Sequence, residues 1–197
     1  MTATPSEKMR LREQYRAARH AVSADDAANA ALAIRDHFLG GIEMTAKCAV
    51  AGTLPLPGEV DPIPLMRALH ENGHPLCLPA MPKQTGGPGK PLAFRAYAPG
   101  DPLAVAAFGV REPGPEMEIL TPAIVLTPLI AVDQAGNRLG QGGGFYDRTM
   151  GVFRAALHPP RFIGLAYAAQ VVDSLPHDRF DQPLDGVVTE EGVTLFS

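Results

Sequence analysis

What this 197-residue chain lacks limits what it can be. It has only two cysteines, Cys48 and Cys77, each in an apolar run and without zinc-type Cys/His spacing, so we expect buried thiols. No apolar run approaches the ~20 residues that span a bilayer. The opening MTATPSEKMRLREQYR has no hydrophobic stretch of the secretory kind. We therefore expect a reduced, cytoplasmic protein with no membrane partner.

Positive charge is also scarce. Lys and Arg number 17 against 21 Asp and Glu, which gives a formal net charge of −4. This balance argues against a general nucleic-acid-binding protein, because such proteins are usually basic. The histidines form no HExxH-type pair, and no GxSxG or Cys/His nucleophile pattern is present. The usual motifs of covalent catalysis and of a histidine metal centre are therefore missing.

Glycine and proline, at 20 each, are abundant and spread through the chain, which indicates a loop-rich fold. The length suits one domain, 1–197. Periodicity and capping predict helices at 6–21, 23–38, 61–72 and 145–157, and apolar runs predict strands at 48–52, 75–79, 92–97, 123–128, 162–167 and 187–196. Since strands alternate with helices, we predict the α/β class with a mainly parallel sheet. The segment KQTGGPGKP at 83–91 is expected to be a mobile loop.

The densest glycines lie in RLGQGGGFYDR, residues 138–148, beyond the predicted strand at 123–128. In open α/β sheets, ligands bind past the carboxyl ends of the strands. Glycines let backbone N–H groups approach an anion, the next helix adds positive dipole, and Arg138 can bind phosphate bidentately. The segment is neither a Walker A motif nor a GxGxxG fingerprint. It therefore predicts either a phosphate-binding loop or a tight structural turn with positive φ.

Acidic residues near this segment have two interpretations. Asp147, in the first turn of the predicted helix, either stabilises the helix dipole or binds Mg²⁺ beside phosphates. A metal site would need a second acid. The segment LPHDRFDQPLDGVVTE offers Asp178, Asp181 and Asp185, whose alternative role is turn formation.

The first predicted helix carries two adjacent stripes. At 100° per residue, one stripe is apolar and contains Leu11, Tyr15, Ala18 and Val22. The other is basic and contains Lys8, Arg12, Arg16 and Arg19. The basic stripe is either a solvated face or, if the apolar stripe docks the helix, a source of cations for a cleft. Glu59 is likewise either an exposed loop acid or a hydrogen-bond acceptor for a ligand.

Several segments share their order and spacing with one protein family. They are the Lys8/Arg12/Arg19 spacing, EVD at 59–61, FRAYAPGDPL at 94–103, GVREP at 109–113, VDQAGNRLGQGGGFYDR at 132–148 and LPHDRFDQPLDGVVTEEGV at 175–193. Each alone is weakly specific, whereas together they cover nearly the whole chain. In this set the chain resembles the 5-formyltetrahydrofolate cyclo-ligase family, also called methenyltetrahydrofolate synthetase.

The resemblance implies a Rossmann-like three-layer α/β sandwich and a monomer that acts on small molecules. The implied reaction is the ATP- and Mg²⁺-dependent conversion of 5-formyltetrahydrofolate to 5,10-methenyltetrahydrofolate, with ADP and phosphate released. The formyl oxygen would be phosphorylated to an iminium phosphate, which N10 then attacks. Such a transfer depends on positioning and charge neutralisation. The absence of nucleophile motifs is therefore expected, and no general base is assigned.

The family's functional residues transfer by position. ATP is assigned to Lys8, Arg12, Arg138, Leu139, Gly140, Gln141, Gly142, Gly143, Gly144, Phe145 and Tyr146. The reduced folate is assigned to Leu54, Glu59, Gln141, Gly142, Gly143, Gly144 and Phe145, and Mg²⁺ to Asp147 and Asp185. Two positions depart from the family: Phe145 replaces the first of two tyrosines, and Gln141 stands where larger aromatic or basic residues are common.

Two other functions are weighed against this one. A fold-sharing binding or regulatory module, for RNA for example, does not explain the retained Lys8, Glu59 and Asp147, and the acidic net charge opposes it. Another phosphate-binding α/β enzyme, such as a sugar-phosphate isomerase, does not explain the N-terminal pair of Lys8 and Arg12. The cyclo-ligase is therefore the function that the sequence predicts.

Overall fold

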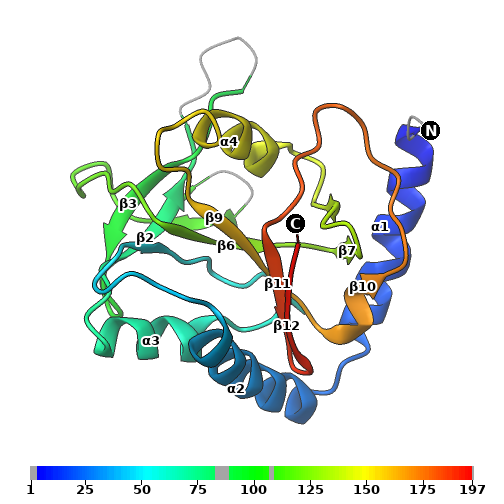
Figure 1. The fold of residues 1–197 in the computed structure, drawn as a ribbon, viewed down its shortest axis with the longest axis horizontal. Coiled ribbons are helices and arrows are strands. Elements are labelled where there is room, and N and C mark those ends of the chain that lie inside the picture. Colours follow the sequence, from blue (N-terminus) through cyan, green and yellow to red (C-terminus); the bar gives the residue numbers. More distant parts are fainter. Residues whose placement is uncertain (1–3, 83–88, 107–108, 197) are drawn as a thin grey trace.

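The central sheet of the computed structural model, which describes residues 4–82, 89–106 and 109–196, has the strand order β12-β11-β9-β6-β1-β2-β3 (Figure 1). Five strands run parallel: β1 (Val50–Ala51), β2 (Leu76–Ala80), β6 (Ile124–Pro128), β9 (Arg161–Leu165) and β11 (Gly186–Thr189). The edge strands β3 (Ala93–Tyr97) and β12 (Gly192–Leu195) are antiparallel to their neighbours. The predicted α/β class with a mainly parallel sheet is confirmed. The loop expected at 83–91 falls largely outside the described residues.

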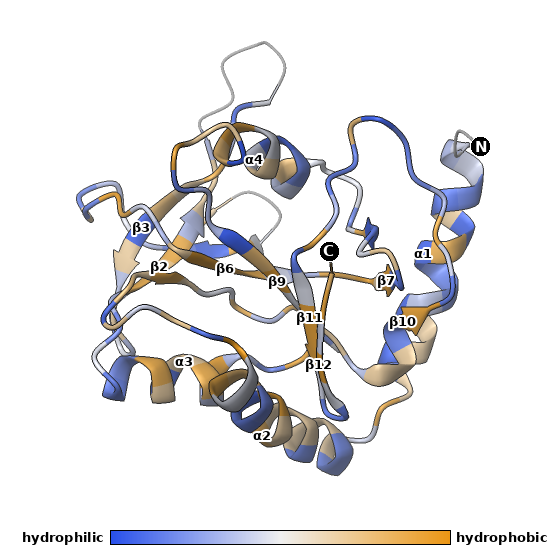
Figure 2. Ribbon diagram, in the orientation of Figure 1, coloured by the Kyte–Doolittle hydropathy of each residue, from blue (hydrophilic) through white to orange (hydrophobic). Residues whose placement is uncertain are grey.

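Helices cover both faces of the sheet, as the predicted three-layer sandwich requires (Figure 1). On one face lie α2 (Ala24–Gly41) and α3 (Ile63–Glu71), whose Phe38 and Leu69 pack on the strands. On the other lies α4 (Phe145–Phe153), whose Met150 is fully buried against Phe162 of β9. Strands buried on both faces carry near-continuous apolar sequence, and Figure 2 shows this hydrophobic character along β9.

The two cysteines differ in burial. Cys77, in β2, is fully buried, and burial raises its pKa to about 12. Cys48 is only half-buried, so the expectation of two buried thiols is wrong for it, and both are free. No helix in the described part of the chain has the length and apolar character needed to cross a membrane.

The first helix, α1 (Pro5–His20), packs against a second, three-stranded sheet. That sheet contains β10 (Val171–Val172), β7 (Ala131–Asp133) and β8 (Arg138–Leu139). As predicted, Leu11 and Tyr15 pack on its core. The apolar stripe is wrong at Ala18, which is exposed, whereas Arg19 is buried. Arg19 pairs with the carboxylate of Glu59, and this pairing explains why burial of a charged residue is tolerated here.

Element boundaries show where local sequence patterns fail. Helix α1 begins at Pro5, because Thr4 rather than Ser6 is the N-cap and its hydroxyl accepts a 3.2 Å hydrogen bond from the amide of Glu7. Helix α4 ends at Phe153, four residues before the predicted end. The sequence also missed several short elements: β4 (Ala104–Val105), β5 (Arg111–Glu112), β7, β8, β10 and the 3₁₀ helix η2 (Ala168–Gln170). Such elements are too short for hydrophobic periodicity to appear.

The packing of α2 on the sheet gives a stability prediction. Phe38 has no exposed surface. We expect Phe38→Ala to lower the free energy of unfolding by about 3–5 kcal/mol, because it removes apolar contacts and leaves a cavity. Urea denaturation measures the change. Leu32→Ala, on the same helix but 44% exposed, is the control and should shift stability by no more than about 0.5 kcal/mol. Equal losses in both variants would contradict this account of the core.

Candidate active site

A cleft of about 610 Å³ opens where β1, β2 and β6 end, the position that open α/β sheets use for ligands. It is lined by Lys8, Arg12, Thr53, Leu54, Pro55, Leu56, Glu59, Pro79, Met81, Leu92, Gly109, Val110, Arg111, Pro128, Arg138, Leu139, Gly140, Gln141, Gly142, Gly143, Gly144, Phe145, Tyr146, Asp147 and Asp181. Every predicted ATP and folate residue is in this set, as is Asp147. Asp185 lies elsewhere.

The glycine segment forms the loop between β8 and α4. Gly142 and Gly144 have φ of 105° and 64°, in the left-handed region, and Gly144 is the N-cap of α4. The structural interpretation, a turn that needs positive φ, is confirmed at these two positions. The Arg12 Nε atom donates a 2.9 Å hydrogen bond to the carbonyl of Gly140, which ties the loop to α1. The phosphate-binding interpretation stays a prediction, with the N-terminus of α4 facing the cleft.

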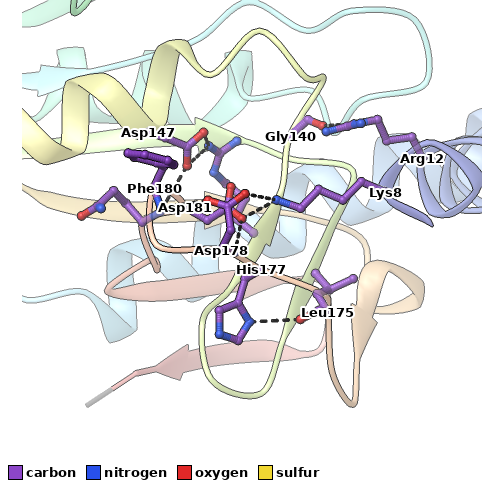
Figure 3. A network of polar contacts seen from close by, with 11 residues as sticks. Lys8, Arg12, Gly140, Asp147, Leu175, His177, Asp178, Phe180 and Asp181 are labelled. Atoms are coloured by element: carbon purple, nitrogen blue, oxygen red, sulfur yellow. Dashed lines mark hydrogen bonds and ion pairs between the residues drawn. The ribbon is translucent and has the colours of Figure 1, made fainter. Parts of the chain in front are cut away.

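Lys8 projects from α1 into an acidic corner of the cleft (Figure 3). Its ammonium group pairs with Asp181 and, at 3.3 Å, with Asp178. Asp181 also accepts a 2.8 Å hydrogen bond from the amide of Asp178. Partial burial opposes the charge on Lys8, but the two carboxylates outweigh it and raise the Lys8 pKa above its ordinary value. Lys8 therefore stays protonated and is held by carboxylate oxygens, the kind of acceptor that a phosphate also offers.

Arg138 and Asp147 pair with each other at the start of α4. One terminal nitrogen of Arg138 lies 3.0 Å from each oxygen of Asp147, and the Arg138 side chain is only 4% exposed. The guanidinium also lies 5.6 Å from the ring centroid of Tyr146. Burial is the main cause that raises the pKa of the Tyr146 hydroxyl, so this group stays neutral. The predicted phosphate-binding arginine and the predicted metal ligand are therefore neighbours.

Asp185 is placed away from this cluster. It lies just before β11, and its carboxylate accepts a 2.7 Å hydrogen bond from the amide of Phe162 at the start of β9. Arg154 lies 3.4 Å from its other oxygen. Because β9 and β11 are parallel, Asp185 lies at the amino ends of the strands, whereas the cleft lies at the carboxyl ends. The structure does not bring Asp147 and Asp185 together, and their shared Mg²⁺ site stays a prediction.

Across the described ranges, no three His, Cys, Asp or Glu side chains converge into a group that could hold a metal ion. Asp147 is 20% exposed and lines the cleft, so one carboxylate is available there. Mg²⁺ in nucleotide sites uses one or two carboxylates together with water and phosphate oxygens. The donor chemistry at Asp147 thus fits an ion that arrives with a nucleotide.

Glu59 also lines the cleft, from the loop after β1. One carboxylate oxygen lies 3.1 Å from an Arg19 guanidinium nitrogen and 3.1 Å from the side-chain amide nitrogen of Gln141. The other oxygen accepts a 3.1 Å hydrogen bond from the amide of Leu56. Arg16 donates a 2.6 Å hydrogen bond to the side-chain oxygen Oε1 of Gln141. The interpretation of the basic stripe as a solvated face is therefore wrong for Arg19, which is buried. Arg16 of the same stripe is bonded to Gln141 of the glycine loop.

Part of the sequence signature is structural. Asp133, 2% exposed, accepts hydrogen bonds from the amides of Ala135, Asn137 and Leu175 and from the Asn137 side chain. At Gly136, φ is 81°, and a Cβ atom would lie 2.9 Å from the carbonyl of Leu184. The DQAGN portion therefore shapes the β7–β8 turn that delivers the glycine loop to the cleft.

The sequence missed the far end of the cleft. Pro79, Met81, Leu92 and Val110 give it an apolar lining, with Arg111 beside them. Glu112 braces this wall, because its carboxylate accepts a 2.7 Å hydrogen bond from the amide of Met81. The GVREP segment marked part of this wall, but nothing in its composition shows that it meets β2 in space.

Comparison with known proteins identifies the family. The model of the 5-formyltetrahydrofolate cyclo-ligase family matches residues 4–190. The chain is 32% identical over 181 residues to the 5-formyltetrahydrofolate cyclo-ligase of Haemophilus influenzae, covering 90% of this chain and 94% of that protein. It is 35% identical over 148 residues to the protein of the same name from Escherichia coli K12, covering 73% and 79%.

Solved structures agree with this result. The Aquifex aeolicus 5,10-methenyltetrahydrofolate synthetase superposes with a TM-score of 0.77 at 29% identity, over 95% of this chain and 92% of that one. The Mycoplasma pneumoniae synthetase gives a TM-score of 0.71 at 21% identity, over 93% and 99%, and supports the fold alone. The fold, the cleft and these matches lead to one conclusion: the chain is an enzyme that belongs to the 5-formyltetrahydrofolate cyclo-ligase family.

Proposed function

We propose that this enzyme converts 5-formyltetrahydrofolate to 5,10-methenyltetrahydrofolate with ATP and Mg²⁺, releasing ADP and phosphate. The observation that carries the proposal is that three segments distant in the sequence line one cleft. They are α1, the loop after β1, and the glycine loop with the start of α4. A cleft of about 610 Å³ is within the range typical of ligand sites, and here two ligands would meet end to end.

The nucleotide's phosphates would lie at the end formed by α1 and the glycine loop. Lys8 and Arg12 provide positive charge there, and the first backbone N–H groups of α4 have no partner within the helix. Phosphate oxygens would replace Asp181 and Asp178 as acceptors for Lys8. Arg138 lies beside this end, already oriented by Asp147.

The pterin would lie between Leu54, Phe145 and Glu59. Phe145 is half-buried and lines the cleft, and its ring keeps the flat surface of the tyrosine it replaces. Glu59 is suited to accept paired hydrogen bonds from the pterin's N–H donors, because a carboxylate has several lone-pair sites. Gln141 now donates to one of these sites, and a bound pterin would take its place.

The chemistry requires positioning rather than a protein nucleophile. The formyl oxygen attacks the γ-phosphorus, ADP departs, and the product is an iminium phosphate on N5. N10 then attacks the formyl carbon, loses its proton, and the ring closes as phosphate leaves. Alignment of the reacting atoms and neutralisation of phosphate charge lower the barriers to both steps. Lys8, Arg12 and the α4 N-terminus supply that neutralisation.

Mg²⁺ would be held at Asp147, where it would offset charge on the transferring phosphate. Asp185 is the second ligand that family membership suggests, although its carboxylate contacts Phe162 and Arg154 at the other edge of the sheet. The proposed metal site therefore rests on Asp147. Whether Asp185 also binds Mg²⁺ is tested by measuring the magnesium requirement of an Asp185 variant.

One assay tests the proposed reaction. The protein is mixed with ATP, Mg²⁺ and 5-formyltetrahydrofolate, and the ultraviolet absorbance of the methenyl product is followed. We expect product and ADP to form in equal amounts, and none to form when ATP is omitted. Absence of ATP-dependent turnover from protein that circular dichroism shows to be folded would overturn the proposal.

A further inference from the structure

Arg19 is buried at the end of α1, where a charged residue is costly unless it is paired. Its side chain is 4% exposed, and its partner Glu59 is 8% exposed. A second guanidinium nitrogen donates to the carbonyl of Pro57 at 3.3 Å. Arg19 therefore contacts the 55–59 loop at two points.

The 55–59 loop fits closely against the end of α1. Gly58 has φ of 77°, and a Cβ atom there would lie 2.6 Å from Nδ1 of His20. The positive φ favours glycine at this position, and the short distance to the His20 ring shows that the loop lies close to the end of α1. The loop thus lies beside His20 at Gly58 and is bonded to α1 through Arg19.

Arg19 lies behind Glu59 rather than in the cleft. Arg19 lines a separate cavity of about 10 Å³ together with Glu59, Leu165 and Gln170. It is absent from the lining of the large cleft. Gln170 is itself fixed, because it donates to the carbonyls of Leu129 and Ile130. Arg19 therefore reaches Glu59 from a side that borders this small cavity and the hydrogen-bonded Gln170.

The partners of Glu59 divide into two groups. Arg19 and the amide of Leu56 are parts of the scaffold, whereas Gln141 belongs to the exposed glycine loop. A ligand can replace Gln141 without disturbing the other two. The scaffold partners fix where the carboxylate points, and the cleft side of the carboxylate stays available to a ligand.

We propose that Arg19 is a positioning residue for folate binding, which holds the Glu59 carboxylate facing the cleft. This inference rests on the proposed role of Glu59 as the pterin anchor. Arg19 acts through Glu59 and contacts neither substrate. Because the carboxylate is oriented before the ligand arrives, less free energy is spent on ordering it during binding.

The test compares Arg19→Met, Arg19→Lys and a control, Arg10→Met, on an exposed part of the same helix. Calorimetry gives the Kd for 5-formyltetrahydrofolate and, separately, for ATP. We expect Arg19→Met to weaken folate binding about 10–100-fold, the range for a charged hydrogen bond, with ATP binding changed less than twofold. Arg19→Lys should recover part of the loss, and Arg10→Met should bind both ligands as the wild type does.

A double-mutant cycle separates positioning from a general loss of structure. In a Glu59→Gln background, Arg19→Met should cost no further folate affinity, because its effect passes through the carboxylate. Equal folate affinity in wild type and Arg19→Met would overturn the proposal, as would additive effects in the double mutant. Should Arg19→Met fail to fold, the same cycle is run with Arg19→Lys. Wild-type protein that binds no folate would contradict the proposed function itself, a different result.

Discussion

Glu59→Gln is expected to weaken 5-formyltetrahydrofolate binding about 10–100-fold while leaving ATP affinity within about twofold. The amide has one acceptor oxygen where the carboxylate has two, so it cannot serve Leu56, Arg19 and paired pterin donors together. A lost hydrogen bond to a charged group costs about 1.5–3 kcal/mol, which corresponds to this range. Calorimetric titration of each ligand measures the two affinities.

The same substitution should also lower stability, because it leaves the buried guanidinium of Arg19 without its counter-charge. Removing one partner of a buried pair costs about 3–5 kcal/mol. Binding is therefore measured well below the variant's unfolding temperature. Glu13→Gln, on the exposed side of α1, is the matched control and should change neither ligand's affinity. Parallel loss of folate and ATP binding would indicate that Glu59 shapes the whole cleft rather than anchoring one substrate.

The parts of the site that could be predicted from the sequence are those specified by short, local sequence patterns. The glycine loop could be found because closely spaced glycines mark left-handed backbone, and Gly142 and Gly144 have that conformation. The position beyond a central strand followed from the alternation of strands and helices. The roles transferred from the family then selected side chains that the fold brings together, from Lys8 near the N-terminus to Asp147 in α4.

What the sequence could not predict depends on contacts between distant segments. Helical periodicity placed Ala18 inward and Arg19 in a basic stripe, because periodicity weighs hydrophobicity and ignores pairing. The burial of Arg19 is decided by Glu59, forty residues away. The same limit applies to Asp178 and Asp181. The sequence offered them as metal ligands or turn residues, and only the folded chain shows them as partners of Lys8.

Asp147→Asn is expected to lower kcat about 100-fold or more at ordinary Mg²⁺ concentrations and to raise the Mg²⁺ concentration needed for half-maximal turnover. Metal stabilisation of a transferring phosphoryl group is worth several kcal/mol, and each 1.36 kcal/mol is tenfold in rate. Asn keeps the shape of Asp but removes the charge that attracts the ion. A second measurement, the effect of Mg²⁺ on ATP affinity by calorimetry, should show a smaller gain in the variant.

Asp147→Asn is expected to affect stability as well as metal binding. Asp147 also pairs with the nearly buried Arg138, so Asn should lower the unfolding temperature as well as the rate. Loss of stability alone does not change a magnesium requirement, and the Mg²⁺ titration is therefore the deciding measurement. An unchanged requirement would mean that Asp147 serves Arg138 and not the metal.

Asp185→Asn completes the comparison, because its amide oxygen can still accept from Phe162 while the charge is lost. A raised magnesium requirement in this variant would show that both carboxylates serve the ion, as family membership suggests. It would also mean that the segment before β11 moves when the nucleotide binds. Asp185 lies at the amino ends of the parallel strands, whereas the cleft lies at their carboxyl ends. A magnesium requirement equal to that of the wild type would leave Asp147 as the ligand at the phosphates. Asp185 would then have a structural role, as the acceptor for the amide of Phe162 at the start of β9.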